Sequence, residues 1–340
     1  MRTMQVIKQI AQPGGSVRDL AEGEAHELFG GMLDGGLPDL ELGAVLIALH
    51  LKSESGGELL GFQRALRERL YPLRAPTARA RPLLLPAYGG ARTEHNLLPL
   101  LGLLLRRLGV PVLFHGTLEG SGRLASVYIL REFGVLPSAS LLQAQARLDA
   151  EHITFVPTAV LCPGLAALLA LRNRLGVRNS AHLVAKLLDP FGGHSVLVIG
   201  ASRPQTLEQL AGVLLELGAC ALLLASTEGE PFASPRRRPR IEHFRRGVRQ
   251  TLFEEEAGPV RPVAGLPAGI DAHATAQWMR LALAGEAPIP YPLVNQLACC
   301  LYACGYTDDM NQAKAIAAVE AGSLAPGAQG GHRRGVQHSA

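Results

Sequence analysis

The sequence predicts an α/β protein in which a small N-terminal helical subdomain precedes a large domain with a mainly parallel central sheet. Region 1–74 carries only helical patterns, whereas from Leu83 onward short apolar runs alternate with helical patterns. This alternation is typical of parallel sheets whose strands are joined by helices. Of the 340 residues, 48% are hydrophobic and only 18% are charged, so the chain can bury a substantial core.

The N-terminal subdomain is predicted to contain three helices. The first opens at Asp19 and runs through Met32, where Asp34-Gly35-Gly36 ends it. The second starts at Pro38 and places four apolar residues on one face, at Leu42, Val45, Leu46 and Leu49. The third covers 58–70. The basic, proline-bounded segment 75–82 is predicted to be a hinge.

The large domain is predicted over residues 83–322. Its buried strands are expected at 83–85, 110–114, 154–156, 195–199 and 221–225, with helices between them. Around 165–188 the pattern becomes helical again. The last segment, 323–340, is rich in glycine and alanine and lacks apolar periodicity, so a disordered tail is expected.

Composition excludes several classes of protein. No run approaches the roughly 20 uncharged apolar residues of a membrane span, and the N-terminus lacks the apolar core of a secretion signal. The five cysteines form no C-x-x-C pair, and the helical spacing of Cys300 and Cys304 favours buried free thiols in a cytoplasmic, reduced protein. The net charge of +4 is mild, so a polyanionic partner must be argued from where the charge lies.

A glycine turn follows the first predicted strand. The strand leads into Tyr88-Gly89-Gly90-Ala91, and the next strand, one helix later, ends in Phe114-His115-Gly116. A strand that feeds a glycine turn and a helix start can offer backbone N–H groups and the helix dipole to an anion.

This order of segments resembles anthranilate phosphoribosyltransferase, of glycosyltransferase family 3 with its nucleoside phosphorylase-like fold, over roughly residues 18–320. That family has a Gly-Thr-Gly-Gly-Asp loop after its first strand and a Lys-His-Gly-Asn-Arg-Ser segment one helix later. The resemblance implies that part of 165–190 returns to the helical subdomain. It also implies a relict phosphoribosyl site at Tyr88, Gly89, Gly90, Asn96, His115, Gly116, Arg123, Glu228 and Glu230.

Most of the family's ligand chemistry is missing. Phosphoribosyl transfer needs an amide-lined pyrophosphate cradle, Mg²⁺ held by carboxylates and a polar site for the nucleophile. Phe114, Leu118 and Glu119 stand where the family has lysine, arginine and serine. The family's Asp-Glu dipeptide is replaced by Glu228 and Glu230, for which a solvated loop is favoured over a weak divalent-ion site. No catalytic residue, metal or cofactor is therefore expected. His115 either caps a strand end or contacts a ligand.

Cations gather in two later segments. The first resembles the family's Gly-Val-Arg-Thr stretch, whose arginine contacts the anthranilate carboxylate, and is either a solvated helix face or an anion-binding surface. In the second, a polyanion contact on an exposed insertion is favoured, although the acidic cluster 254–256 can pair with part of it. The first comprises Arg172, Arg174, Arg178 and Lys186, and the second Arg236, Arg237, Arg238, Arg240, Arg245, Arg246 and Arg249.

These losses, together with the sequences at 39–43, 178–182 and 227–230, resemble the bacterial YbiB-type paralogues of the enzyme. That resemblance implies a cytoplasmic homodimer, joined through the N-terminal helices, that binds DNA or RNA without sequence preference. One alternative is a phosphoribosyltransferase that uses Mg²⁺ and an unidentified aromatic or purine-like acceptor. A third is a catalytically silent partner protein. Salt-dependent DNA binding separates the first of these from the other two.

Overall fold

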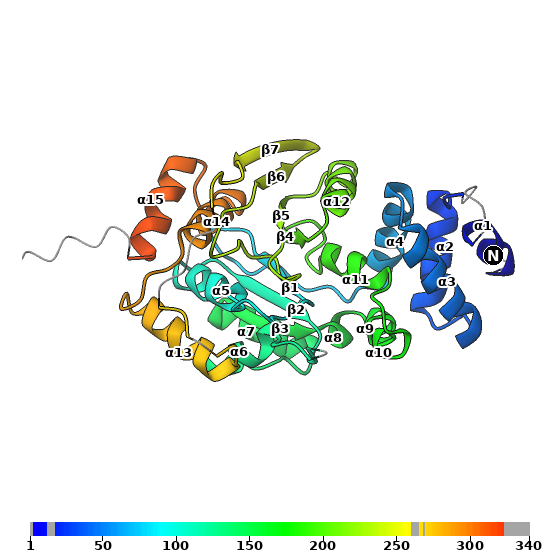
Figure 1. Ribbon diagram of the computed structural model, residues 1–340, viewed down its shortest axis with the longest axis horizontal. Coiled ribbons are helices and arrows are strands. Elements are labelled where there is room, and N and C mark those ends of the chain that lie inside the picture. The colour runs from blue at the N-terminus through cyan, green and yellow to red at the C-terminus, as the bar shows by residue number, and fades with distance from the viewer. Residues whose placement is uncertain (1–2, 12–17, 121, 260–264, 268, 323–340) are drawn as a thin grey trace, which may run out of the picture.

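The structure is a computed structural model, which describes residues 3–11, 18–120, 122–259, 265–267 and 269–322. The segment expected to be a disordered tail, 323–340, lies outside them. Figure 1 shows a helical subdomain at one end of the molecule and a helix-flanked sheet beside it. The subdomain contains α1 (Thr3–Ile10), α2 (Glu22–Leu33), α3 (Asp39–Lys52) and α4 (Gly56–Glu68), against which α8 (Thr158–Leu161), α9 (Pro163–Ala170), α10 (Arg172–Leu175) and α11 (Ala181–Val184) lie.

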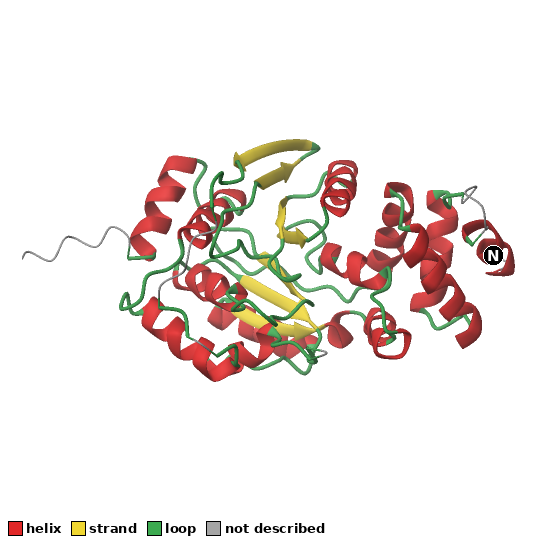
Figure 2. Cartoon of the chain, viewed as in Figure 1, coloured by secondary structure: helices red, strands yellow, loops and turns green. Residues whose placement is uncertain are grey.

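Within the described residues, a seven-stranded sheet has the order β3-β2-β1-β4-β5-β6-β7 (Figure 2). Five strands are parallel: β1 (Leu83–Ala87), β2 (Val112–Gly116), β3 (Ile153–Pro157), β4 (Val196–Ala201) and β5 (Ala221–Ala225). The helices of this domain are α5 (Leu98–Arg107), α6 (Ser126–Glu132), α7 (Leu141–Glu151), η1 (Ala185–Leu187), α12 (Pro204–Glu216), α13 (Ala272–Leu283), α14 (Tyr291–Ala303) and α15 (Met310–Glu320). The predicted fold class is confirmed.

The two faces of the sheet are covered by different cores. Along β1, Leu83 and Leu85 belong to a core with α5 and α14, whereas Leu84 faces a second core shared with the helical subdomain. Successive side chains of a strand point to opposite faces. Both faces are therefore apolar, which is why the strands read as continuous hydrophobic runs rather than alternating ones.

The arginine-rich insertion differs from the exposed flap that the sequence predicted. It contains β6 (Ile241–Arg245) and β7 (Val248–Phe253), an antiparallel hairpin that extends the edge of the sheet. Ile241 and Phe244 are buried in the cores, and Glu242 is buried because Arg240 and Arg249 pair with it. Strand β6 was not predicted because charged residues such as Glu242 interrupt its apolar sequence.

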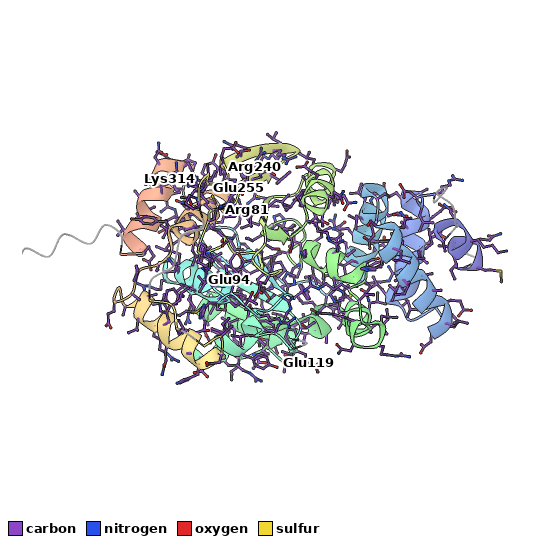
Figure 3. The ribbon with its side chains drawn as sticks, viewed as in Figure 1. Arg81, Glu94, Glu119, Arg240, Glu255 and Lys314 are labelled. Carbon is purple, nitrogen blue, oxygen red and sulfur yellow. The ribbon has the colours of Figure 1, made fainter. Side chains whose placement is uncertain are left out.

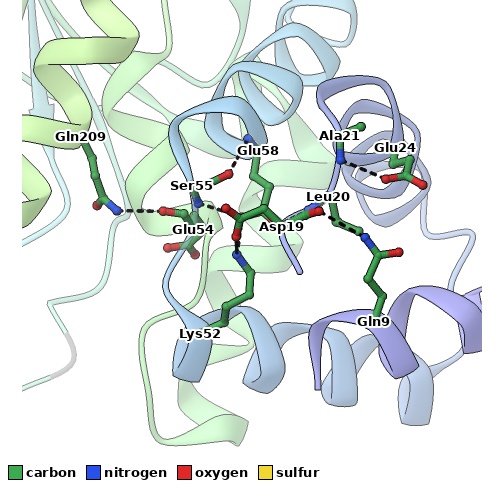
Figure 4. Close-up of polar contacts among 10 residues, drawn as sticks. All are labelled: Gln9, Asp19, Leu20, Ala21, Glu24, Lys52, Glu54, Ser55, Glu58 and Gln209. Atoms are coloured by element: carbon green, nitrogen blue, oxygen red, sulfur yellow. Dashed lines mark hydrogen bonds and ion pairs between the residues drawn. The ribbon is translucent and has the colours of Figure 1, made fainter. Parts of the chain in front are cut away.

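A buried polar network fixes the turn between α3 and α4 (Figure 4). The carboxylate of Glu58, which is fully buried, accepts hydrogen bonds from the N–H groups of Leu20 at 2.9 Å and Ser55 at 2.7 Å. Lys52 Nζ lies 2.7 Å from the same carboxylate. On the neighbouring turn, Gln209 of α12 donates to the carbonyl oxygen of Glu54 at 2.8 Å, which ties the subdomain to the α/β domain.

The cysteines agree with the sequence prediction: all five are free thiols, four are buried and Cys220 is partly buried. None of the helices in the described part of the chain is long and apolar enough to cross a membrane.

Candidate functional site

The relict site lies at the carboxyl ends of the parallel strands, where open α/β sheets receive their ligands. The turn after β1 carries Gly89 and Gly90, and the turn after β5, residues 226–230, packs directly on it. A Cβ on Gly89 would lie 2.7 Å from the carbonyl carbon of Gly229, so only glycine permits this approach. Gly116, at the end of β2, is equally constrained, since a Cβ there would lie 2.1 Å from the carbonyl oxygen of Ala87.

Two carboxylates of the chain itself occupy the cradle that the glycine turn forms. Glu230, which is 1% exposed, accepts hydrogen bonds from the N–H groups of Gly89 at 2.9 Å and Gly90 at 2.5 Å. Glu228 accepts from the N–H of Arg92 at 2.6 Å and from the Thr93 hydroxyl at 2.6 Å. The donors that would otherwise hold a phosphate are thus already bonded to anionic oxygens.

The sequence prediction of a solvated loop at these glutamates is therefore wrong. The turn folds over the cradle because Glu228 adopts φ 52° and Gly229 φ 101°, which aim the side chains of Glu228 and Glu230 back toward β1. The left-handed φ of Glu228 is uncommon for a residue with a side chain and is held here by the hydrogen bonds of its carboxylate. Arg123 Nη1 donates to the carbonyl oxygen of Glu228 at 3.1 Å and secures the same turn.

Two of the predicted anion-binding cations face this closed site. Lys186 Nζ donates to the carbonyl oxygen of Gly200, and burial lowers the pKa of Lys186 to about 8. Burial also lowers the pKa of Arg178. Burial raises the pKa of Glu230 to about 7, although the hydrogen bonds from Gly90 and Gly89 and the charges of Lys186 and Arg178 oppose the rise. The positive charges of Lys186 and Arg178 thus offset the charge of the buried Glu230 carboxylate. Of the two interpretations left open by the sequence, the solvated helix face does not apply to these two residues.

His115 takes part in a buried network rather than capping a strand end. Its Nδ1 lies 2.9 Å from the Tyr88 hydroxyl, which lies 3.0 Å from the Thr158 hydroxyl. Thr158 donates in turn to the carbonyl oxygen of Gly116 at 3.1 Å. Burial lowers the pKa of His115 to about 3, so the imidazole is neutral. Thr158 was not predicted from the sequence, where nothing distinguishes it from an ordinary strand-end threonine.

Asn96 also serves the fold. Its side-chain oxygen accepts from the N–H of Leu98, the first residue of α5, at 3.2 Å, and its amide donates to Ser126 at 3.0 Å, all from a fully buried position.

The residues present do not fit the Mg²⁺ that the fold family implies. Mg²⁺ binds through several free oxygens, whereas both oxygens of Glu228 and the Oε1 atom of Glu230 already accept N–H and O–H donors. Glu230 Oε2 is buried without a hydrogen-bond partner, and this single oxygen does not make a metal site. In the described ranges, no three His, Cys, Asp or Glu side chains are placed to hold a metal ion.

A cavity of about 270 Å³ opens beside the network of His115. Tyr88, Thr158, Arg172 and His182 contribute to its wall, together with Glu119, which replaces a serine of the resembled enzyme. Arg172 thus lines this cavity, whereas Arg174 lies 3.3 Å from Asp39 and lines a different, smaller cavity of about 170 Å³ with it.

Most of the second cationic segment is paired within the chain. Arg236 lies 3.1 Å from Glu94, Arg240 lies 3.1 Å from Glu242, and Arg249 contacts both Glu208 and Glu242 at 2.8 Å. Further contacts of the segment include those of Arg237 with the carbonyl oxygen of Gly258, of Arg238 with the carbonyl oxygen of Glu254 and the ring of Phe253, and of Arg240 with Glu254.

The expected pairing with the acidic cluster 254–256 is thus confirmed for part of the segment; Figure 3 labels Arg240 and Glu255 over this hairpin. Arg245 and Arg246, at the hairpin tip, have no acidic partner within the described residues. They lie at the amino ends of the parallel strands, since Phe244 pairs with Ala221, the first residue of β5. The tip of the second segment, Arg245 and Arg246, therefore lies at the opposite edge of the sheet from the cradle.

Comparison with known proteins gives the family. A model described as "Glycosyl transferase family, helical bundle domain" matches residues 4–70. The chain is 41% identical over 305 residues to "Uncharacterized protein YbiB" of Escherichia coli K12, which covers 88% of this chain and 94% of that protein. It is 31% identical over 212 residues to an anthranilate phosphoribosyltransferase of Desulfitobacterium hafniense Y51, 62% of each chain. The crystal structure of anthranilate phosphoribosyltransferase from Thermus thermophilus superposes with a TM-score of 0.76 at 24% identity, over 95% of each chain.

Proposed function

The chain belongs to the YbiB family, which has the fold of anthranilate phosphoribosyltransferase, and from that premise we propose that it binds nucleic acid without sequence preference and is not an active enzyme of that type. The proposal includes a cytoplasmic location, where free thiols are usual.

The observation that carries the proposal is the occupation of the cradle by Glu228 and Glu230. A diphosphate would have to displace both carboxylates from the N–H groups of Gly89, Gly90 and Arg92. While the carboxylates stay, the negative charge of Glu228, whose pKa its hydrogen bonds lower despite burial, repels a phosphate at close range. The alternative, a phosphoribosyltransferase for another acceptor, also needs a diphosphate in the cradle and so requires the same displacement of Glu228 and Glu230. The observed hydrogen bonds therefore do not favour it.

Exposed arginines are the second observation that supports nucleic-acid binding. Arg245 and Arg246 are exposed at the tip of the β6–β7 hairpin and lack acidic partners in the described part of the chain. The guanidinium group suits phosphate oxygens in any sequence context. Aromatic residues make up only 5% of the chain, so contacts to phosphates rather than stacked bases are expected to supply the affinity.

A two-fold homodimer is part of the proposal. On α3, Leu40 is 83% exposed and Leu51 is 78% exposed, and Met4 on the neighbouring α1 is 68% exposed. Apolar side chains this exposed, grouped in one subdomain, suit an interface between identical copies. The same surface would serve a silent partner protein, so it does not choose between the two functions.

A mobility-shift experiment tests the proposal. Several unrelated DNA sequences of equal length are titrated at about 50 mM and about 200 mM salt. We expect similar affinities for all sequences at low salt and a steep loss at high salt. The proposal fails if no sequence binds at low salt, or if one sequence binds far better than the others.

A further inference from the structure

A second cavity, of about 280 Å³, lies at the opposite edge of the sheet from the closed cradle. Its wall includes Leu197 near the start of β4 and Cys220 directly before β5, so it sits at the amino ends of the parallel strands. The cradle lies at the carboxyl end of β5. The five residues of that strand separate the two sites by about 16 Å at the usual rise of a parallel strand. Open α/β sheets usually receive their ligands at the carboxyl edge, and this recess lies at the other edge.

Four arginines from three parts of the chain form the rim of this recess. Arg67 comes from α4, Arg81 precedes β1, and Arg245 and Arg246 come from the hairpin tip. All four are exposed, and none has a carboxylate partner within the described residues. The one acidic residue among the described lining, Asp189, is occupied: its carboxylate accepts the N–H groups of Phe191 at 2.9 Å and Gly193 at 2.8 Å.

The hairpin turn that presents two of these arginines is conformationally unusual. Arg246 has φ 51° and Gly247 has φ 75°, so both residues of the two-residue turn are left-handed. Such turns favour asparagine, aspartate or glycine at the first position, because a longer side chain costs energy there. Arginine at this position therefore strains the backbone locally, and such strain is often found at binding sites.

The floor of the recess is apolar. Six leucines line it: Leu66, Leu70, Leu187, Leu188, Leu197 and Leu217. A cationic rim over an apolar floor fits a molecule with an anionic group on a weakly polar body. Four positive charges against one occupied carboxylate favour an anion with more than one negative charge, and the volume is close to the lower end of about 300 Å³ for small-ligand pockets.

From these observations we propose that the recess binds one nucleotide, with its phosphates on the four arginines and its base and sugar over the leucines. The nucleotide is either free or an unstacked unit of a single strand. The second form rests on the proposed nucleic-acid function and deepens it; the first does not depend on it.

The test compares two double variants with a matched control. One recess variant combines Arg245→Ala with Arg246→Asn, since asparagine suits the left-handed turn and keeps the hairpin. The other combines Arg67→Ala with Arg81→Ala. The control combines Arg64→Ala and Arg131→Ala, which remove two exposed cations outside the recess, one of them on the same helix as Arg67. ATP and AMP are titrated by calorimetry, and a labelled 12-nucleotide single strand by fluorescence anisotropy.

We expect ATP to bind more tightly than AMP, and each recess variant to lose at least about tenfold in affinity, as removal of charge-assisted hydrogen bonds implies. The control should stay within about twofold. If only the single strand binds and only the recess variants weaken it, the nucleotide is a unit of the strand. If recess and control variants bind ATP and the strand alike, or neither ligand binds the parent, the proposal is overturned. A parent that binds ATP but no strand defeats the nucleic-acid function alone.

Discussion

The carboxylate of Glu230 accepts the N–H of Gly89 at 2.9 Å, across 141 residues of sequence. The glycine turn of an anion-binding fold is thus retained together with its backbone donors, and an internal carboxylate takes the place of the ligand. The nearby cations Lys186 and Arg178 favour the charged form of the buried Glu230 carboxylate, as they would favour a bound phosphate.

The first expectation is that phosphoribosyl diphosphate does not bind. With Mg²⁺ present, calorimetric titration at micromolar protein should give no heat, because the cradle donors are bonded to Glu228 and Glu230. No anthranilate should be consumed. Micromolar binding with turnover of anthranilate would establish the enzymatic alternative instead.

Replacement of Glu230 should destabilise the fold. Glu230→Ala leaves two buried N–H groups without acceptors and removes the counter-charge of Lys186 and Arg178, which costs about 3–5 kcal/mol in the free energy of unfolding. Glu230→Gln keeps an oxygen acceptor and should cost less. Urea unfolding measures both. The exposed Glu27→Ala serves as the control and should change stability by less than about 0.5 kcal/mol. Equal losses for the alanine and glutamine variants would contradict the role of the hydrogen bonds.

Stability should fall as pH falls from 6.5 to 4.5. Burial lowers the pKa of His115 to about 3 and those of His182 and His243 to about 4, so in this window the unfolded chain binds protons that the folded chain does not. Each such histidine contributes up to about 1.4 kcal/mol per pH unit. Glu230, with its pKa raised to about 7, acts in the opposite direction between pH 4.5 and 7, because the folded state holds its proton more tightly.

Burial also raises the pKa of Glu320, but three histidines outweigh these two glutamates, so stability still falls as the pH falls. Urea midpoints at pH 6.5, 5.5 and 4.5 measure it. His243→Gln should flatten the dependence, whereas His50→Gln, at an exposed position, should leave it unchanged. A midpoint that rises toward pH 4.5 would show the assignment to be wrong.

Nucleic-acid binding should be steeply salt-dependent. Each phosphate contact contributes about 0.9 to the log–log slope on duplex and about 0.7 on a single strand, so about five contacts on duplex lose roughly 500-fold for a fourfold rise in salt. Arg236, Arg237 and Arg238 are engaged within the chain, and their joint change to alanine should lower the slope less than removal of Arg245 and Arg246. Equal slopes for both variants and the parent would place the nucleic-acid contacts elsewhere on the surface.

The helical subdomain should mediate dimerisation. Changing Leu40 and Leu51 together to glutamate should convert a dimer into a 36.1 kDa monomer, as measured by light scattering. Leu142→Glu, on α7 and 82% exposed, is the matched control and should remain dimeric. A parent that is itself monomeric at working concentration would refute the expectation.

The sequence predicted local features better than contacts between distant segments. The strand at 221–225 was predicted with its observed bounds because an uninterrupted apolar run needs no information from elsewhere in the chain. The hairpin at 241–253 was missed because Glu242 interrupts the apolar pattern and becomes compatible with burial only when Arg249 pairs with it. The role of Glu230 was missed for a related reason: its partners, Gly89 and Gly90, lie on another turn, and no local pattern brings them together.

Because Glu228 and Glu230 belong to the chain itself, the affinity measured for an anion that binds the cradle would be lower than its intrinsic affinity. The Glu228–Glu230 turn and the N–H donors of the cradle belong to one chain. The two carboxylates therefore compete with a free anion at an effective concentration of at least about 1 mM. A diphosphate whose intrinsic dissociation constant is micromolar would therefore be measured as far weaker, in proportion to the small fraction of molecules in which the turn has swung away. Shortening or loosening that one turn would change the apparent affinity without altering any residue that touches the ligand.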